Sequence, residues 1–189
     1  MDLGRLSALA AELRRCSWWD DARHLGGSVR QSTERTSDLL VVGTPDAEPW
    51  HLVAHLADAA RFGSGLAATP TLLRWRVPPT APAHLAVGVE RLADVRRSTL
   101  LVVAPAAAPA GLLQRISDAR NRGATILSVA GDDGSVAASD LAGLTHDQVL
   151  LPTPDEVELD LAGHVVGAAA ASALLPAQNR RRGLFRVAS

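Results

Sequence analysis

The sequence predicts an α/β protein with a doubly wound, parallel, five-stranded sheet of the flavodoxin-like type. Short apolar runs without polar interruption recur along the chain, and such runs are typical of parallel strands that are buried on both faces. Between them lie segments with helical spacing of about ten to fifteen residues, which favours right-handed crossovers between parallel strands. The expected strands are residues 39–42, 71–77, 99–104, 124–130 and 148–151.

The spacing of apolar residues, together with residues that typically begin or end helices, predicts the helical segments. Residues 3–30 carry Leu and Ala at helical intervals, and a polar interval at 30–37 leads to the first strand. Residues 111–122 form the next clear helix, which Gly123 closes as a C-cap. A late helix begins after Pro152, with Thr153 or Asp155 as its N-cap. We expect one domain over residues 1–178 and a basic tail over 179–189.

Composition narrows the class of protein. The chain has 189 residues, of which 47% are hydrophobic, enough for an ordinary core. Its formal net charge of −1 gives no reason to expect nucleic acid or an anionic membrane as a partner. All 19 basic residues are Arg, which indicates a GC-rich, bacterial coding bias. The single cysteine, Cys16, and the lack of a signal-peptide core or membrane-length apolar run predict a cytoplasmic protein.

Candidate functional residues gather where the strands end, because ligands of doubly wound sheets bind off the carboxyl ends of the strands. These ends are the loops at 43–49, 104–111 and 130–135. The candidate ligand-binding residues in them are Thr44, Asp46, Ala106, Ala107, Asp132 and Ser135.

Histidines suggest a second kind of site. His51 and His55 are four residues apart, so a helix puts both imidazoles on one face, a spacing that suits a tetrahedral metal. The late helix offers His164 together with Glu156 or Asp160 to complete such a site. The alternative is that the two early histidines fall on a helix by chance and are satisfied by their neighbours.

Three segments resemble the sugar isomerase (SIS) domain family, and within it the phosphoheptose isomerases. They are the sequence GTPDAEPWHLVAHL after the first strand, the stretch STLLVVAPAAAPAGLLQRISDARNRGATILSVAGDDGS, and the late helix with Glu156 and His164 eight residues apart. The resemblance covers most of residues 38–172. It implies a sugar or sugar-phosphate ligand, a homodimer or homotetramer, and zinc held by His51, His55, Glu156 and His164. Helical spacing makes Asp160, one turn before His164, a rival to Glu156.

The loops depart from the family pattern. The first contains Asp46 and Glu48 between two prolines, and the second is built from alanine and proline where the family keeps hydroxyl residues. Prolines remove N–H donors and carboxylates repel phosphate, so we expect a non-classical sugar-binding or assembly module with degenerate phosphate loops. The alternatives are a divergent zinc-dependent ketose–aldose isomerase and a structural oligomer subunit without ligand. In the enzyme alternative, Glu156, His164 and Asp46 are the catalytic candidates.

Two simpler interpretations stay open for charged residues near this site. Asp46 and Glu48 are placed to cap the helix that follows Pro49. Arg74 and Arg76 alternate around Trp75, which allows a contact with an anion but favours an edge strand that faces solvent.

Overall fold

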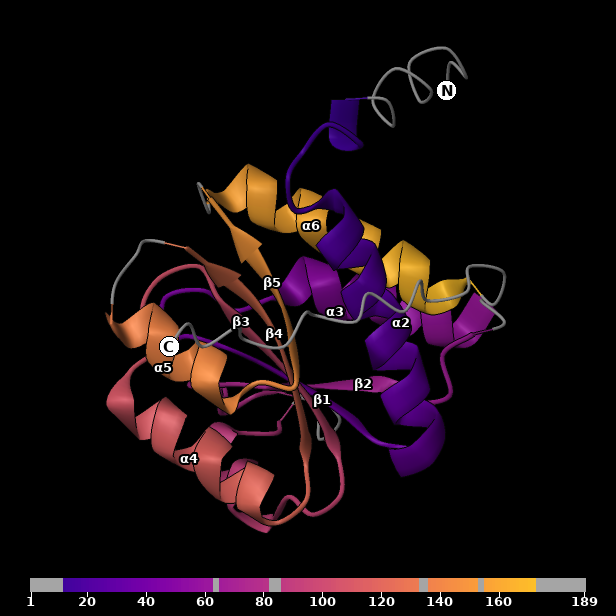
Figure 1. The fold of residues 1–189 in the computed structure, drawn as a ribbon. Helices are drawn as coiled ribbons and strands as arrows, with labels where there is room; N and C mark the ends of the chain where they lie inside the picture. Colours follow the sequence, from indigo (N-terminus) through magenta and orange to yellow (C-terminus); the bar gives the residue numbers. More distant parts are fainter. Residues whose placement is uncertain (1–11, 63–64, 82–85, 133–135, 153–154, 173–189) are drawn as a thin grey trace, which may run out of the picture.

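A computed structural model of the protein describes residues 12–62, 65–81, 86–132, 136–152 and 155–172. Within them, five parallel strands form one sheet in the order β2-β1-β3-β4-β5. Helices cover both faces of this sheet (Figure 1). The predicted doubly wound, five-stranded parallel sheet is therefore confirmed.

The strands lie close to the apolar runs that predicted them. They are β1 (Leu39–Gly43), β2 (Pro70–Leu73), β3 (Thr99–Ala104), β4 (Thr125–Gly131) and β5 (Asp147–Leu151). Alternate side chains of a strand point to opposite faces: Leu39 and Val41 join one hydrophobic core, whereas Leu40 and Val42 join the other. This double burial explains why the central strands are uninterrupted apolar runs.

Three helices cover one face of the sheet. These are α2 (Trp19–Thr36), α3 (Trp50–Phe62) and α6 (Glu156–Ala171). Their buried side chains, among them Leu25, Leu56 and Val166, form one core with the inward residues of the sheet. Asp155 is the N-cap of α6, since its Oδ1 accepts from the Glu158 backbone N–H at 2.7 Å. This contact selects Asp155 from the two predicted caps.

The opposite face is covered by a 3-10 helix, η2 (Val89–Asp94), together with α4 (Ala110–Asn121) and α5 (Val136–Leu144). Leu92, Leu112 and Ile116 are fully buried there. The α4 helix ends as the sequence predicts: Gly123 has a φ of 90°, a conformation that glycine adopts without steric cost.

The N-terminal prediction is wrong in its boundaries. Residues 14–18 form turns, and the helix then runs from Trp19 to Thr36, through most of the polar interval that was expected to follow it. Residues 1–11 lie outside the described part. Gly26 lies inside this helix and has a packing role: a Cβ there would lie 2.5 Å from the Val166 carbonyl oxygen and 2.6 Å from the Ala169 Cβ. Close contact with α6 therefore stabilises the helix where local sequence does not.

The predicted strand at 71–77 is also too long. The ladder ends at Leu73, and only an isolated bridge joins Arg74 to Gly88. No helix in the described ranges is long and apolar enough to cross a membrane.

Candidate functional site

A cavity of about 430 Å³ opens at the carboxyl ends of the central strands. The chain leaves β1 toward β2 on one side and returns to β3 on the other, so this edge is the switch point at which doubly wound folds bind ligands. The turn after β1, the start of α3, the ends of β3 and β4, and one face of α6 form its walls. Its polar lining side chains are Asp46, Glu48, Trp50, His51 and Asp160.

The turn that begins the cavity is tightly built. A Cβ at Gly43 would collide with the Ala47 carbonyl oxygen, so glycine is required where β1 ends. The Ala47 N–H donates to the Thr44 carbonyl at 3.1 Å and closes the turn. Pro49 then leads directly into α3, whose first residues face the cavity.

Arg74 holds two of the lining side chains in place. Its guanidinium lies 4.5 Å from the ring centre of Trp50, and its Nη2 lies 3.3 Å from Glu48 Oε2. Both charged side chains are mostly shielded, with 17% and 20% of their surface exposed for Arg74 and Glu48. The neighbouring Trp75 donates its Nε1–H to the Gly43 carbonyl at 2.9 Å, which ties the end of β2 to that of β1.

These contacts correct two expectations from the sequence. Arg74 and Trp75 do not belong to an edge strand facing solvent, although Arg76 is exposed. The Glu48 carboxylate, offered as a helix cap, forms an ion pair with Arg74 instead. The sequence singled out Arg74 but not its two partners, because they lie 24 and 26 residues earlier in the chain.

Two of the candidate metal ligands meet at the cavity: His51 on α3 and Asp160 on α6. His51 Nδ1 lies 2.8 Å from Asp160 Oδ2, a hydrogen bond between residues 109 positions apart. The His51 side chain is 70% exposed, so solvent screens this pair strongly. Of the two rivals proposed on the late helix, Asp160 is the one that contacts an early histidine.

His55 and His164 lie against each other, outside the cavity lining. Their ring centres are 3.9 Å apart and their planes are tilted by 43°. Burial lowers the pKa of His55, and the nearby His164 lowers it further because two positive charges would repel.

The histidines do not assemble as a tetrahedral metal centre in this structure. Among the described residues, no group of three or more His, Cys, Asp or Glu side chains could hold a metal ion. His51 directs Nδ1 to Asp160, whereas His55 and His164 pack ring against ring. The Glu156 side chain lies outside the described part, so the four-ligand zinc set stays a prediction, and the described geometry does not favour it.

The remaining predicted ligand residues are only partly brought together. Asp46 lines the cavity, and Thr44 is buried in the turn behind it. Ala106 and Ala107 are exposed and do not line the cavity, whereas the neighbouring Pro105 does. Asp132 is exposed beyond β4, with its N–H donating to the Leu151 carbonyl at 2.8 Å. Ser135 lies outside the described residues.

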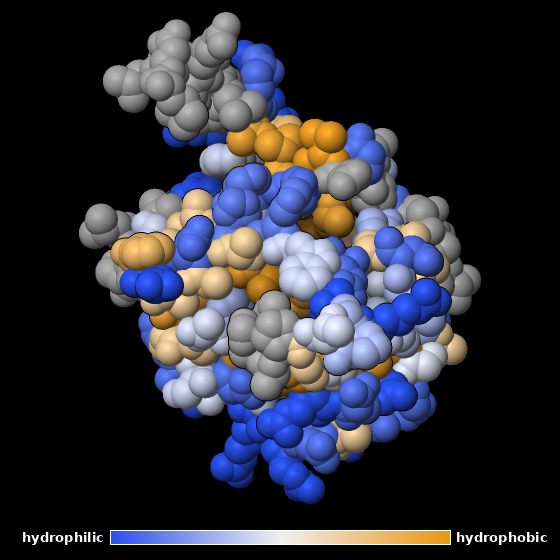
Figure 2. Space-filling model, turned by 180° about the vertical axis from the view of Figure 1, so that it is seen from behind, coloured by the Kyte–Doolittle hydropathy of each residue, from blue (hydrophilic) through white to orange (hydrophobic). Residues whose placement is uncertain are grey.

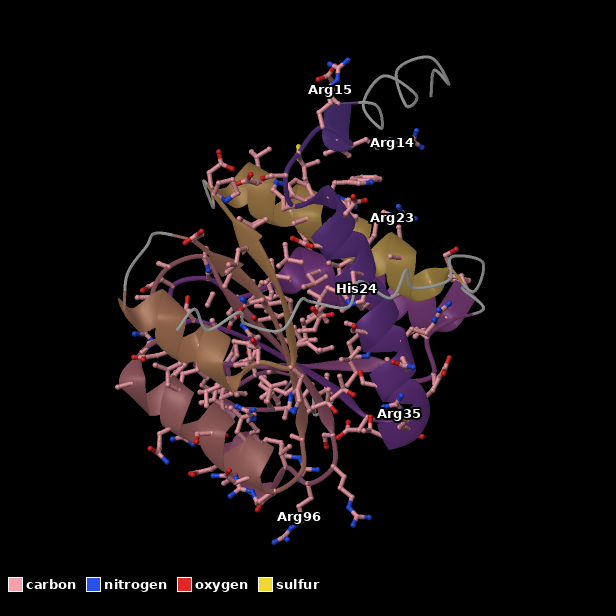
Figure 3. All side chains as sticks on the ribbon, viewed as in Figure 1. Arg14, Arg15, Arg23, His24, Arg35 and Arg96 are labelled. Carbon is pink, nitrogen blue, oxygen red and sulfur yellow. The ribbon has the colours of Figure 1, made fainter. Side chains whose placement is uncertain are left out.

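The cavity is acidic. Of the residues that the structure describes, three carboxylates line it, from Asp46, Glu48 and Asp160, and no Arg side chain does. Arg74 stands behind the wall and is already paired with Glu48. Of the arginines labelled in Figure 3, Arg14, Arg15 and Arg23 project from the N-terminal segment and α2, and Arg96 lies at the far end of the molecule. Among the described residues that line the cavity, an anionic ligand therefore meets no guanidinium.

Comparison with solved structures identifies the fold. A phosphoheptose isomerase from Francisella tularensis matches with a TM-score of 0.56 and 9% identity over 90% of this chain and 96% of that one. A Silicibacter pomeroyi protein assigned as a phosphosugar isomerase matches with a TM-score of 0.53 and 18% identity over 82% of this chain. The chain spans only 43% of that protein's length.

A third similar structure contains a ligand. The Vibrio vulnificus NanR protein, complexed with ManNAc-6P, matches with a TM-score of 0.50 and 13% identity over 88% of this chain and 61% of that one. No protein-family model and no curated protein sequence matches the chain. The structural matches confirm the fold that the sequence resemblance predicted, that of sugar isomerase domains.

Proposed function

Because the chain has the fold of sugar isomerase domains, we propose that it is a sugar-binding protein whose ligand occupies the cavity at the ends of β1, β3 and β4. The observation that carries the proposal is the cavity itself, which lies at the switch point of the sheet. Its volume of about 430 Å³ is sufficient for a monosaccharide. The NanR complex supports the ligand class, since that protein of the same fold is complexed with a sugar phosphate.

The walls of the cavity suit a sugar's mixed surface. Trp50 is 42% exposed and offers an aromatic surface to the C–H groups of a sugar ring. Leu52, Val103 and Val129 add apolar wall, whereas Asp46 and Asp160 provide oxygens that accept hydrogen bonds from hydroxyl groups. This combination of apolar surface and few polar groups is typical of small-molecule sites.

A binding screen tests the proposal. Saturation-transfer NMR would be recorded with a panel of aldoses, ketoses and their phosphates, on the wild type and on Trp50→Ala. We expect at least one sugar to bind and Trp50→Ala to weaken it about tenfold, which corresponds to about 1.4 kcal/mol. Phe62→Ala is the matched control, because Phe62 is an exposed aromatic residue at the other end of α3. If no sugar binds, or if both variants behave alike, the proposal is wrong.

A second candidate function, isomerisation of a bound sugar, has one observation in its favour. A histidine held by a carboxylate is a common arrangement for general acid–base chemistry, and His51 and Asp160 form such a pair within the cavity. Ketose–aldose interconversion would be assayed with every sugar that binds. Turnover that is lost in both His51→Ala and Asp160→Asn would favour the enzyme, whereas binding without turnover would leave a binding module.

Self-association, expected from the resemblance, is part of the proposal. Val157 on α6 exposes 65% of its surface. Figure 2 shows an apolar area beside the N-terminal segment, surrounded by polar residues. Light scattering coupled to size-exclusion chromatography would measure the mass of the particle, and a monomer at micromolar concentration would contradict this part.

A further inference from the structure

The charges around the cavity determine which sugars it can take. Glu48 and Arg74 neutralise each other, since their side chains are paired and largely shielded from solvent. Asp46 is different: its side chain makes no hydrogen bond or ion pair with any residue that the structure describes, and it is exposed at the cavity wall. One full negative charge is therefore available to a ligand there.

The other charges that the described residues place at the cavity do not reverse this balance. Asp160 adds a second negative charge, which His51 offsets only when it is protonated. The N-terminus of α3 also faces the cavity and contributes about half a positive charge. That contribution is smaller than the charge of Asp46 alone, so the cavity stays negative, and a ligand phosphate with a charge near −2 would be repelled.

Building on the proposed function, we propose that the cavity binds an unphosphorylated sugar that carries a protonated amino group. The ammonium group pairs with Asp46, the ring packs against Trp50, and hydroxyl groups donate to the remaining carboxylate oxygens. Glu48 is the specificity-determining residue against phosphate, because it pairs with Arg74, whose guanidinium also contacts the lining residue Trp50. The ligand class is thus opposite in charge to a sugar phosphate.

Three hexoses test the inference by calorimetry at pH 7 and low salt: D-glucosamine, D-glucose and D-glucose 6-phosphate. We expect glucosamine to bind about three- to tenfold more tightly than glucose, the range of a partly exposed charged contact, and glucose 6-phosphate to bind more weakly than either. Raising the salt concentration should reduce the difference between glucosamine and glucose.

Variants separate the roles of the carboxylates. Asp46→Asn should bring the affinity for glucosamine down to that for glucose. Asp140→Asn, which removes one exposed charge on α5 outside the cavity, should leave the ratio unchanged. Glu48→Gln releases Arg74 and should increase the affinity for glucose 6-phosphate severalfold.

The outcomes distinguish this inference from the function on which it rests. Equal binding of glucosamine and glucose, or tighter binding of the phosphate, would overturn the charge selectivity but keep a sugar-binding protein. Absence of binding by all three hexoses and by the wider sugar panel would overturn both. A preference for glucosamine that survives Asp46→Asn would show that the ammonium group pairs elsewhere, which contradicts the inference as stated.

Discussion

The contact between α2 and α6 at Gly26 makes a strong prediction for Gly26→Ala. The new Cβ would lie 2.5 Å from the Val166 oxygen, 2.6 Å from the Ala169 Cβ and 3.0 Å from the Ala170 nitrogen. None of these atoms is at the end of a flexible side chain, so they move only if the two helices separate. Both helices pack on the same face of the sheet, and their separation would loosen the core there.

The magnitude follows from two opposing effects. In a helix interior, alanine is favoured over glycine by about 1 kcal/mol. Overpacking of a well-packed core costs about 1–3 kcal/mol, and three contacts with immobile atoms place Gly26 at the upper end of that range. The net effect is a loss of about 2 kcal/mol in the free energy of unfolding. For a chain of 189 residues, this lowers Tm by about 4–8 °C.

Urea unfolding and thermal unfolding, both followed by circular dichroism, would measure the effect. Gly111→Ala is the matched control, because Gly111 is also helical but nothing lies within 4 Å of its added Cβ. That control should be as stable as the wild type or more stable by up to about 1 kcal/mol. A Gly26→Ala variant at least as stable as the wild type would refute the close approach of α2 and α6.

Further predictions concern protonation, a buried hydroxyl, a helix cap and zinc. Because the pKa of His55 is lowered in the folded state, its contribution to stability is full above the unfolded pKa of 6.5 and is lost as pH falls toward the folded pKa. Tm should therefore fall less between pH 7.5 and 5.5 in His55→Gln than in the wild type, and equal falls would contradict this. The Ser128 hydroxyl is buried without a partner among the described residues, so Ser128→Ala should raise the free energy of unfolding by about 1 kcal/mol; a loss in urea unfolding would reveal an undetected hydrogen bond. Asp155→Ala removes the α6 cap and should lower the free energy of unfolding by about 1 kcal/mol, whereas Asp155→Asn should keep most of the wild-type stability. Elemental analysis of protein purified without an affinity tag should find zinc well below one equivalent, and stoichiometric zinc would restore the predicted metal site.

Local sequence was sufficient to predict the five strands of the sheet and the end of α4. A strand buried on both faces requires consecutive apolar residues, so residues 39–42 predicted β1 without knowledge of its neighbours. Gly123 marked the end of α4 because few other residues adopt its positive φ. The resemblance to sugar isomerase domains rests on such elements in order along the chain. This resemblance predicted the fold. The expected strands also predicted that ligands bind at the carboxyl ends of β1 and β3, where the cavity lies.

Partners within the site depended on the tertiary structure. The sequence predicted that His51 and His55 meet His164 and Glu156 or Asp160 at one site. It did not indicate that His51 bonds Asp160, or that His55 packs against His164 instead of joining it around a metal. Likewise Arg74, assigned from its alternation to a solvent-facing strand, is shielded between Glu48 and Trp50.

The sequence predicts some properties and not others because some depend on neighbouring residues and others on contacts between distant parts of the chain. Whether a segment becomes a strand or a helix depends on the spacing of its own apolar residues, which the sequence by itself contains. The end of α2 was not predictable in this way. The helix continues past Arg30 because Gly26 allows α6, some 140 residues later, to approach it. Which charge is neutralised and which is left for a ligand depends on distances of a few ångströms between elements far apart in the chain. Only the packing of α3, the β2 end and α6 around the sheet sets those distances, and with them the acidic character of the cavity.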